Sequence, residues 1–191
     1  MIYPIVVYGN PVLRRQAQEI SENYSGLLAL IADMFETLEH AHGVGLAAPQ
    51  INLSIRLVVI DASPFGEVDP KAVGFKKAFI NPVILEEEGE PWAFNEGCLS
   101  FPGLYEDVFR KPNIRVSYRD ENGQEHEQAF DGMIARIIQH ECDHLNGKTF
   151  VDRLNPLRKT LLRRRLDDIS KGEVKTSYRV DCARKTKSKR V

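Results

Sequence analysis

The stretch Gln139-His140-Glu141-Cys142-Asp143-His144-Leu145-Asn146-Gly147 contains the pattern His-Glu-x-x-His. Residues four positions apart lie on one face of a helix, so His140 and His144 can bind one metal ion from the same side. Glu141 lies about 100° further around such a helix, within reach of a water molecule bound to that ion. Two imidazoles and a carboxylate in this arrangement can generate hydroxide near neutral pH, which is the chemistry of a metal-dependent hydrolase.

The residues around this motif predict a buried helix over 132–145. Apolar side chains recur at roughly helical spacing from Met133 onward. Asp131 is expected to cap the start of the helix, and Asn146-Gly147 is expected to end it, because glycine readily takes the left-handed conformation. Two histidines and a glutamate would be costly to bury on so apolar a helix without a partner. This cost favours a metal site over a core helix with incidental histidines.

Length and composition indicate one globular domain. The chain has 191 residues, of which 42% are hydrophobic and 28% are charged. No apolar run approaches the roughly 20 residues of a membrane span, and the N-terminal residues do not resemble a signal peptide, so we expect no membrane partner. The three cysteines, Cys98, Cys142 and Cys182, show no paired framework. We therefore expect a reducing, cytoplasmic location.

The positive charge is concentrated at the C-terminal end. Residues 157–191 contain 13 lysines and arginines against 4 acidic residues, although the whole chain has a net charge of −1. A basic end on an acidic body suggests a polyanionic partner. From charge alone, a solvated terminal helix is the simpler interpretation.

We expect two helices besides the one at 132–145. The first is amphipathic and covers residues 25–42. The second covers residues 157–171, where Asn155 can cap the start and Pro156 can occupy the first turn. Residues 172–191 are expected to form a weakly structured tail.

Several short segments are typical of β-strands. Asn122-Gly123 lies between two alternating segments and predicts a hairpin, with His126 exposed on its second strand. The segments around Glu86-Glu87-Glu88-Gly89 are expected to be strands on either side of a turn. The expected strands are residues 55–61, 78–85, 92–94, 114–119 and 125–130.

The two histidines need a further ligand, because a catalytic metal site usually has three protein ligands and one position for water. No histidine follows His144, and the only later glutamate, Glu173, lies in a basic segment. Cys98 is the best remaining candidate, since a thiolate binds zinc and ferrous iron strongly. Taken alone, Cys98 would more often be a core cysteine.

Three stretches favour a ligand role for Cys98 over a core role, because together they resemble the motifs of peptide deformylases. They are Gly43-Val-Gly-Leu-Ala-Ala-Pro-Gln50, Glu96-Gly-Cys-Leu-Ser100 and Gln139-His-Glu-Cys-Asp-His144, in that family's order and approximate spacing. The resemblance covers residues 1 to about 170. It implies an α+β fold with antiparallel β-sheets wrapped around the central metal-binding helix, plus an N-terminal and a C-terminal helix. The implied catalytic domain is 1–171, followed by a basic tail at 172–191.

The resemblance also implies residue roles. Cys98, His140 and His144 match the metal ligands, and Glu141 matches the general acid/base. Gln50, through its side-chain amide, and Leu99, through its backbone N–H, match the groups that stabilise the oxyanion. The expected substrate-binding residues are Val44, Gly45, Gly97, Met133 and Ile137. Among these, Met133 and Ile137 fall near the face of the helix that carries His140, and with Val44 they are expected to line a methionine-sized pocket.

The implied activity is removal of the formyl group from the N-terminal formyl-methionine of newly synthesised polypeptides, with release of formate. The family's ion is usually Fe(II), and zinc, nickel or cobalt can take its place; a Cys-His-His set suits all of them. One alternative is a His-Glu-x-x-His metallopeptidase, which would need a third histidine or a glutamate ligand. The other is a structural metal site, which would need four protein ligands. In some family members a C-terminal helix docks on the ribosome, and the basic end of this chain could do the same.

Four other residues carry expectations of their own. Cys142 lies about 200° around the helix from His140, so it is expected to be a buried core thiol. Asp143 also faces away and is expected to pair with a basic residue, with Arg110 as the candidate. Arg136 is expected to reach the surface by its tip. Tyr105 stands where several peptide deformylases place a substrate-contacting arginine, which puts recognition of the second substrate residue in doubt.

Overall fold

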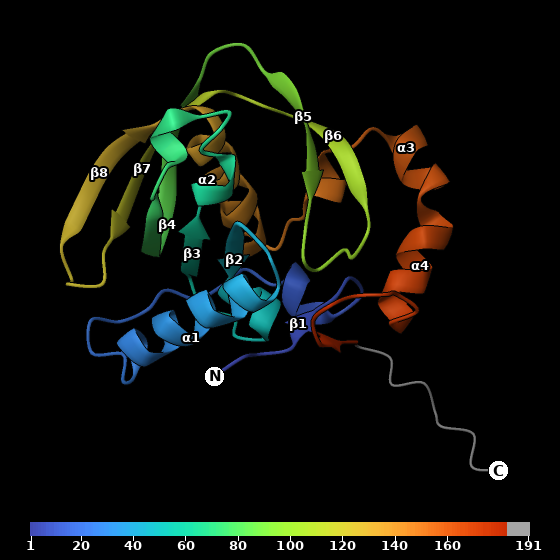
Figure 1. Cartoon of the computed structure of the whole chain (residues 1–191), viewed down its shortest axis with the longest axis horizontal. Helices are drawn as coiled ribbons and strands as arrows, with labels where there is room; N and C mark the ends of the chain where they lie inside the picture. The colour runs from blue at the N-terminus through green and yellow to red at the C-terminus, as the bar shows by residue number, and fades with distance from the viewer. Residues whose placement is uncertain (183–191) are drawn as a thin grey trace.

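Helix α2 (Gly132–Leu145) lies between a five-stranded sheet and a smaller two-stranded sheet (Figure 1). The computed structural model describes residues 1–182. All side chains from Met133 to Leu145 are buried. Apart from Met133, the apolar ones join residues of the five-stranded sheet in one hydrophobic cluster, and polar side chains of the helix face the smaller sheet. The predicted limits of this helix are confirmed.

The five-stranded sheet is antiparallel throughout, with strand order β2-β3-β4-β7-β8. Its members are β2 (Gly45–Ala47), β3 (Leu57–Asp61), β4 (Lys76–Glu88), β7 (Asn113–Arg119) and β8 (Glu125–Phe130). The expected α+β class with antiparallel sheets and several helices is therefore confirmed.

A second antiparallel sheet consists of β5 (Trp92–Gly97) and β6 (Tyr105–Arg110). Strand β6 was not predicted from the sequence. Its buried positions alternate as expected for a strand, but they hold Glu106, Val108 and Arg110, so the inward face is not apolar. The turn predicted at residues 86–89 is wrong for residues 86–88, which continue β4 and pair with β7. The chain turns after Glu88 and leads to β5, which pairs with β6 and not with β4.

The hairpin between β7 and β8 is confirmed, and Asp120 N donates to Gln124 O across the turn. The expectation that His126 is exposed is wrong. Its side chain is half-buried because the ring stacks on Tyr118 and Nε2 lies 2.7 Å from Asp120 Oδ2. A polar sequence context did not reveal these two partners.

The predicted N-terminal helix is present as α1 (Leu27–His40), which packs its buried residues against β3 and β4. The predicted C-terminal helix is divided at Leu162 into α3 (Pro156–Leu161) and α4 (Arg163–Lys171). Asn155 caps α3 as predicted, accepting a hydrogen bond from Arg158 N. Short 3₁₀ helices complete the described chain: η1 (Pro11–Arg14), η2 (Ala48–Ile51), η3 (Ser63–Phe65), η4 (Pro70–Ala72) and η5 (Phe150–Arg153).

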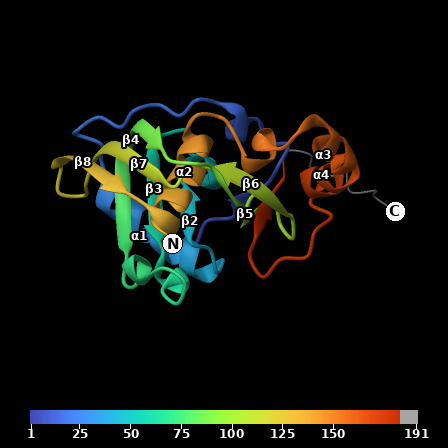
Figure 2. The same cartoon turned by 90° about the horizontal axis from the view of Figure 1, so that it is seen from above.

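Seen from above, α3 and α4 lie at one end of the molecule, beyond β5 and β6, and β8 lies at the other end (Figure 2). Within residues 1–182, no helix is both long enough and apolar enough to cross a membrane.

Residues 172–182, which were expected to be weakly structured, contain one short strand. The chain turns back after Gly172 and forms β9 (Val180–Asp181), which pairs in parallel with β1 (Ile5–Val6). Val180 and Val174 pack against a hydrophobic cluster that also contains α4 residues. Pairing with β1, which is far away in the sequence, holds this segment in place. The rest of the predicted basic tail, residues 183–191, lies outside the described residues.

Candidate active site

Helix α2 begins at a sharp change of backbone direction. Gly132 has a φ of +58°, which a side chain would disfavour. Asp131 occupies the N-cap position, but its side chain pairs with Lys71 and makes no capping hydrogen bond. The cap comes from Asp69, whose Oδ2 accepts from Met133 N at 3.0 Å. The predicted cap residue is therefore wrong, because a carboxylate on a neighbouring loop takes that role.

Cys98, His140 and His144 come together beside this helix. Cys98 directly follows β5, and its Sγ lies 3.3 Å from His144 Nε2. All three ligand atoms lie within 4.8 Å of one another, and among the described residues they form the only such cluster. Ligands of one tetrahedral zinc ion with bonds of ~2.0–2.3 Å would lie about 3.3–3.6 Å apart. The donor set and its spacing therefore fit a single divalent metal ion.

The charges at this point also fit a cation. Burial, reinforced by the nearby His140, lowers the pKa of His144 to about 3, so its imidazole is neutral, as a ligand must be. Burial also opposes a charge on His140, yet hydrogen bonds with Cys98 and Glu96 raise the pKa of that imidazole well above its ordinary value. The Glu96 carboxylate and the Cys98 sulfur thus favour a positive charge at His140, whether a proton or a metal ion.

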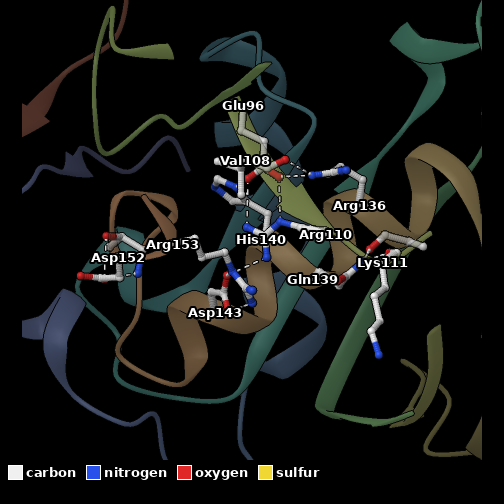
Figure 3. A network of polar contacts seen from close by, with 12 residues as sticks. Glu96, Val108, Arg110, Lys111, Arg136, Gln139, His140, Asp143, Asp152 and Arg153 are labelled. Atoms are coloured by element: carbon white, nitrogen blue, oxygen red, sulfur yellow. Dashed lines mark hydrogen bonds and ion pairs between the residues drawn. The ribbon is translucent and has the colours of Figure 1, made fainter. Parts of the chain in front are cut away.

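Glu96, at the end of β5, fixes the orientation of His140 (Figure 3). Its Oε2 lies 2.8 Å from His140 Nδ1, and its two oxygens also accept hydrogen bonds from Arg110 and Arg136. Burial disfavours the carboxylate, but the His140 and Arg110 hydrogen bonds prevail and hold the pKa of Glu96 below its ordinary range. An ionised Glu96 keeps the proton of His140 on Nδ1 and leaves Nε2 free to bind a metal.

Arg110 connects the Glu96 carboxylate to the Asp143 carboxylate. Its Nη1 donates to Asp143 Oδ2 at 2.8 Å, and Arg153 binds both oxygens of the same carboxylate (Figure 3). The side chain of Arg110 is fully buried. The predicted pair between Asp143 and Arg110 is confirmed, and it braces the outer side of the helix that carries both histidines.

Arg136 differs from its prediction. It is only 3% exposed, and its guanidinium donates to Glu96 Oε1, Val108 O and Trp92 O. The guanidinium also lies 4.3 Å from the centre of the Trp92 ring. Strands β5 and β6 cover this side of α2 and supply acceptors, so the side chain has no need to reach water.

Glu141 is buried and faces the cavity beside Cys98, His140 and His144, the candidate metal-ligand cluster. Burial raises the pKa of its carboxyl group to about 7. Its Oε2 has no hydrogen-bond partner among residues 1–182. The side chain packs so closely over Gly45 that a Cβ there would lie 2.4 Å from Oε1. A carboxylate with this pKa and a free oxygen is suited to take up and return a proton.

Gln50 is held in one orientation inside the site. Its Oε1 accepts from Ala47 N at 2.8 Å, so the amide nitrogen points the other way. That nitrogen lies 3.2 Å from Ser100 Oγ and 3.5 Å from Cys98 Sγ. Gln50 therefore presents a hydrogen-bond donor beside the metal-ligand cluster, where a negatively charged oxygen could accept it.

These residues surround one cavity of about 610 Å³. Glu141 and His140 line it from α2, and Cys98 and Leu99 from the loop after β5. His144 is fully buried behind Cys98. All the other predicted site residues line the cavity: Val44, Gly45, Gln50, Gly97, Cys98, Leu99, Met133, Ile137, His140 and Glu141.

Comparison with known proteins identifies the family. A family model described as polypeptide deformylase matches residues 2–160. The peptide deformylase of Cytophaga hutchinsonii is 53% identical over 180 residues, covering 94% of this chain and 97% of that protein. The peptide deformylase of Flavobacterium psychrophilum is 47% identical over 187 residues, covering 94% and 96%. The chain belongs to the peptide deformylase family.

Solved structures agree with this assignment. The peptide deformylase of Legionella pneumophila has a TM-score of 0.78 at 40% identity, covering 91% of this chain and 98% of that one. The enzyme of Thermus thermophilus has the same TM-score of 0.78 at 44% identity, covering 88% and 98%. Peptide deformylases are metal-dependent hydrolases that remove N-formyl groups from nascent polypeptides. The enzyme class implied by the sequence motifs is therefore confirmed, and the metallopeptidase alternative is not supported.

Within this deformylase, sequence reasoning missed the polar residues that support the candidate metal-ligand cluster. Glu96 lies in one of the three motifs, but the sequence analysis assigns it no role. The one signal that points to its contact with His140 is general: histidines that bind a metal commonly donate to a carboxylate. It also missed Lys175, Thr176, Ser177 and Tyr178, which line the cavity from the C-terminal segment. Tyr105, opposite Gly97 in the β5–β6 pair, lies at the cavity and is 63% exposed.

The buried ion pairs lead to a prediction about the stability of this deformylase. Replacing Arg110 with methionine should lower the free energy of unfolding by about 3–5 kcal/mol, because Glu96 and Asp143 would remain buried without their shared cation. Urea unfolding followed by circular dichroism measures this difference. Arg115→Met is the control, since Arg115 forms only exposed ion pairs and should leave the midpoint nearly unchanged. Equal midpoints for Arg110→Met and wild type would contradict the prediction.

Proposed function

We propose that Cys98, His140 and His144 hold one divalent metal ion and that Glu141, Gln50 and Leu99 carry out deformylation beside it. The observation that carries this proposal is the meeting of the three ligand atoms next to a proton acceptor in one cavity. When bound, the ion supplies a Lewis acid that lowers the pKa of a water molecule toward 7. We propose Fe(II) as the ion in the cell, with zinc, nickel or cobalt able to replace it.

The protein's own residues then divide the reaction between them. The oxygen of the attacking water bonds to the formyl carbon, and Glu141 takes a proton from that water. The carbonyl oxygen gains negative charge and accepts hydrogen bonds from Gln50 Nε2 and from the Leu99 N–H. Glu141 returns the proton to the amine nitrogen as the C–N bond breaks, which gives formate and a free N-terminus.

The peptide part of the substrate has a natural place beside β2. This strand forms an edge of the five-stranded sheet, and Val44 and Gly45 line the cavity at that edge. An extended peptide can add to such an edge through backbone hydrogen bonds. Gly97 lines the same cavity from the end of β5. We propose that the substrate chain lies between these two strands.

Release of formate tests the proposed function directly. The metal-loaded protein should release one formate per formyl-Met-Ala-Ser consumed and should leave the peptide bonds of unmodified Met-Ala-Ser intact. Formate dehydrogenase coupled to NADH absorbance measures the first product, and mass spectrometry follows the peptides. Cleavage of internal peptide bonds without formate release would refute the proposal.

We predict a strong preference for methionine at the first substrate position. Val44, Met133 and Ile137 line the cavity beside the metal-ligand cluster and offer an apolar wall to an unbranched side chain. Formyl-Met-Ala-Ser should have a kcat/KM at least about 100-fold above that of formyl-Asp-Ala-Ser, because burying a carboxylate there carries a large desolvation cost. Equal values for the two peptides would rule out this pocket.

We also propose that the basic C-terminal region binds the ribosome, which places the enzyme beside emerging chains in the cytoplasm. Within α3 and α4, Arg158 is paired with Glu106, and Arg165 donates to Pro102 O. Arg163 and Arg164 are exposed, and they offer the more direct contacts to RNA phosphates.

Charge reversal tests this partner better than truncation does, because Leu166 and Ile169 of α4 are part of the hydrophobic core. The double variant Arg163→Glu/Arg164→Glu should lose salt-sensitive co-sedimentation with ribosomes and keep its turnover of a short formyl peptide. Arg15→Glu/Lys148→Glu changes the same charge at two other exposed positions and is the matched control. Equal sedimentation of the two variants would exclude a contact through α4.

A further inference from the structure

The C-terminal segment of this chain returns to the active site. The family match ends at residue 160, but residues 175–178 line the active-site cavity. We refer to residues 173–179 as the C-terminal strap. They connect the end of α4 to β9 and lie outside the part of the chain that the sequence resemblance covers.

Both ends of the C-terminal strap are fixed. At its start, Gly172 takes a φ of +76° and Glu173 N donates to Asp168 O, which ends α4. At its end, Ile5 N donates to Arg179 O and Val7 N donates to Asp181 O, which joins the strap to β1. The position of the residues between these anchors is therefore set by the body of the protein.

Tyr178 connects the C-terminal strap to Leu99. Its hydroxyl donates to Leu99 O at 2.8 Å. Its ring packs against the same hydrophobic cluster as the Leu99 side chain. Leu99 directly follows Cys98, so this contact reaches the loop that supplies both the candidate sulfur ligand and the candidate oxyanion donor.

The backbone of that loop is held by three donors. Cys98 O accepts from Phe101 N at 2.9 Å, and Ser100 O accepts from Tyr8 N at 2.9 Å. Leu99 O, between them, accepts from the Tyr178 hydroxyl. Two of these donors are backbone N–H groups, and the third is the side-chain hydroxyl of Tyr178. The substitution Tyr178→Phe therefore removes one donor and keeps the ring.

We infer that Tyr178 is a positioning residue for deformylation, holding the Leu99 backbone so that its N–H is directed at the reacting carbonyl oxygen. The inference rests on the proposed oxyanion role of Leu99. Loss of the hydroxyl would let the backbone at Leu99 move, and a donor aimed at the transition state loses effect when it shifts by a fraction of an ångström. Substrate affinity would change little, because the phenyl ring would still form its part of the cavity wall.

The test compares Tyr178→Phe with Tyr24→Phe in the full-length, metal-loaded enzyme. Tyr24 packs against the same hydrophobic cluster, and its hydroxyl has no hydrogen-bond partner within residues 1–182. Tyr178→Phe should lower kcat on formyl-Met-Ala-Ser by about 3- to 10-fold, with KM within twofold, and should keep its metal content and Tm. Amide hydrogen exchange in the peptide that contains Leu99 should become faster. Tyr24→Phe should change none of these quantities.

Unchanged kcat or unchanged exchange at Leu99 in Tyr178→Phe would overturn the inference. A loss of kcat that follows a matching loss of Tm, or that Tyr24→Phe shares, would overturn it as well, because that pattern indicates a general packing role. Wild-type turnover distinguishes this failure from failure of the proposed function. If the wild type releases no formate, the proposed function is refuted, and the exchange measurement still decides whether Tyr178 holds the Leu99 backbone.

Discussion

Glu141→Gln should keep its bound metal and lose about 10²–10⁴-fold in kcat on formyl-Met-Ala-Ser. Glutamine has nearly the same shape and fits over Gly45, where a Cβ would collide with the Glu141 side chain. Its amide cannot take a proton from water or return one to the leaving amine. Burial raises the pKa of Glu141 to about 7, which suits a group that must both accept and release a proton near neutral pH.

The control for this variant is Glu106→Gln. Glu106 is also a buried carboxylate, but it pairs with Arg158 of α3 and does not line the active-site cavity. Both variants should contain stoichiometric metal by elemental analysis, and Glu106→Gln should keep kcat within about threefold of wild type. A metal-loaded Glu141→Gln enzyme with near wild-type kcat would show that another group transfers the proton.

Gln50→Leu should lower kcat by about 10²–10³-fold while the metal content stays unchanged. The substitution removes the Nε2 donor that lies beside Cys98 and Ser100. It should also reduce stability by about 1–3 kcal/mol, because the buried Ala47 N–H would lose the acceptor that Gln50 Oε1 provides. Steady-state kinetics and urea unfolding separate the two effects.

Gln139→Leu controls for the loss of a buried glutamine. Gln139 is 1% exposed and donates to Lys111 O and Ala135 O, away from the cavity. It should lose stability with little change in kcat. If Gln50→Leu behaves in the same way, the Gln50 amide does not stabilise the oxyanion.

Much of the site could be predicted because its signals are local in the sequence. The spacing of His140 and His144 sets their common face on α2, and the run from Met133 to Leu145 with a following glycine sets the length of that helix. The burial of Cys142 follows from its angle around the helix, and burial raises the pKa of its thiol to about 12. These expectations need only helix geometry.

The supporting residues could not be predicted, because their partners are distant in the sequence. Asp69 caps α2 from 64 residues away, and Glu96 reaches His140 across 44 residues. Arg136 is buried only because β5 and β6 bring Glu96 and two carbonyl groups to it. A sequence pattern reports the period of one element, whereas these contacts depend on how elements pack.

The C-terminal segment shows the same limit for backbone pairing. Residues 172–182 form a short segment of mixed polarity with two basic and two acidic residues, so nothing local predicts a strand. Their order comes from the edge of β1, which pairs with Val180 and Asp181. The contact of Tyr178 with Leu99 follows from that pairing and was equally hidden from sequence reasoning.

The most direct test of the central claim is the X-ray absorption spectrum of the zinc-loaded enzyme. If Cys98, His140 and His144 are the ligands, the first shell should contain one sulfur at about 2.3 Å and two nitrogens at about 2.0–2.1 Å. The sulfur contribution should disappear in Cys98→Asp, where a carboxylate oxygen replaces the thiolate. A wild-type first shell made only of nitrogen and oxygen, or an unchanged spectrum in Cys98→Asp, would contradict the account.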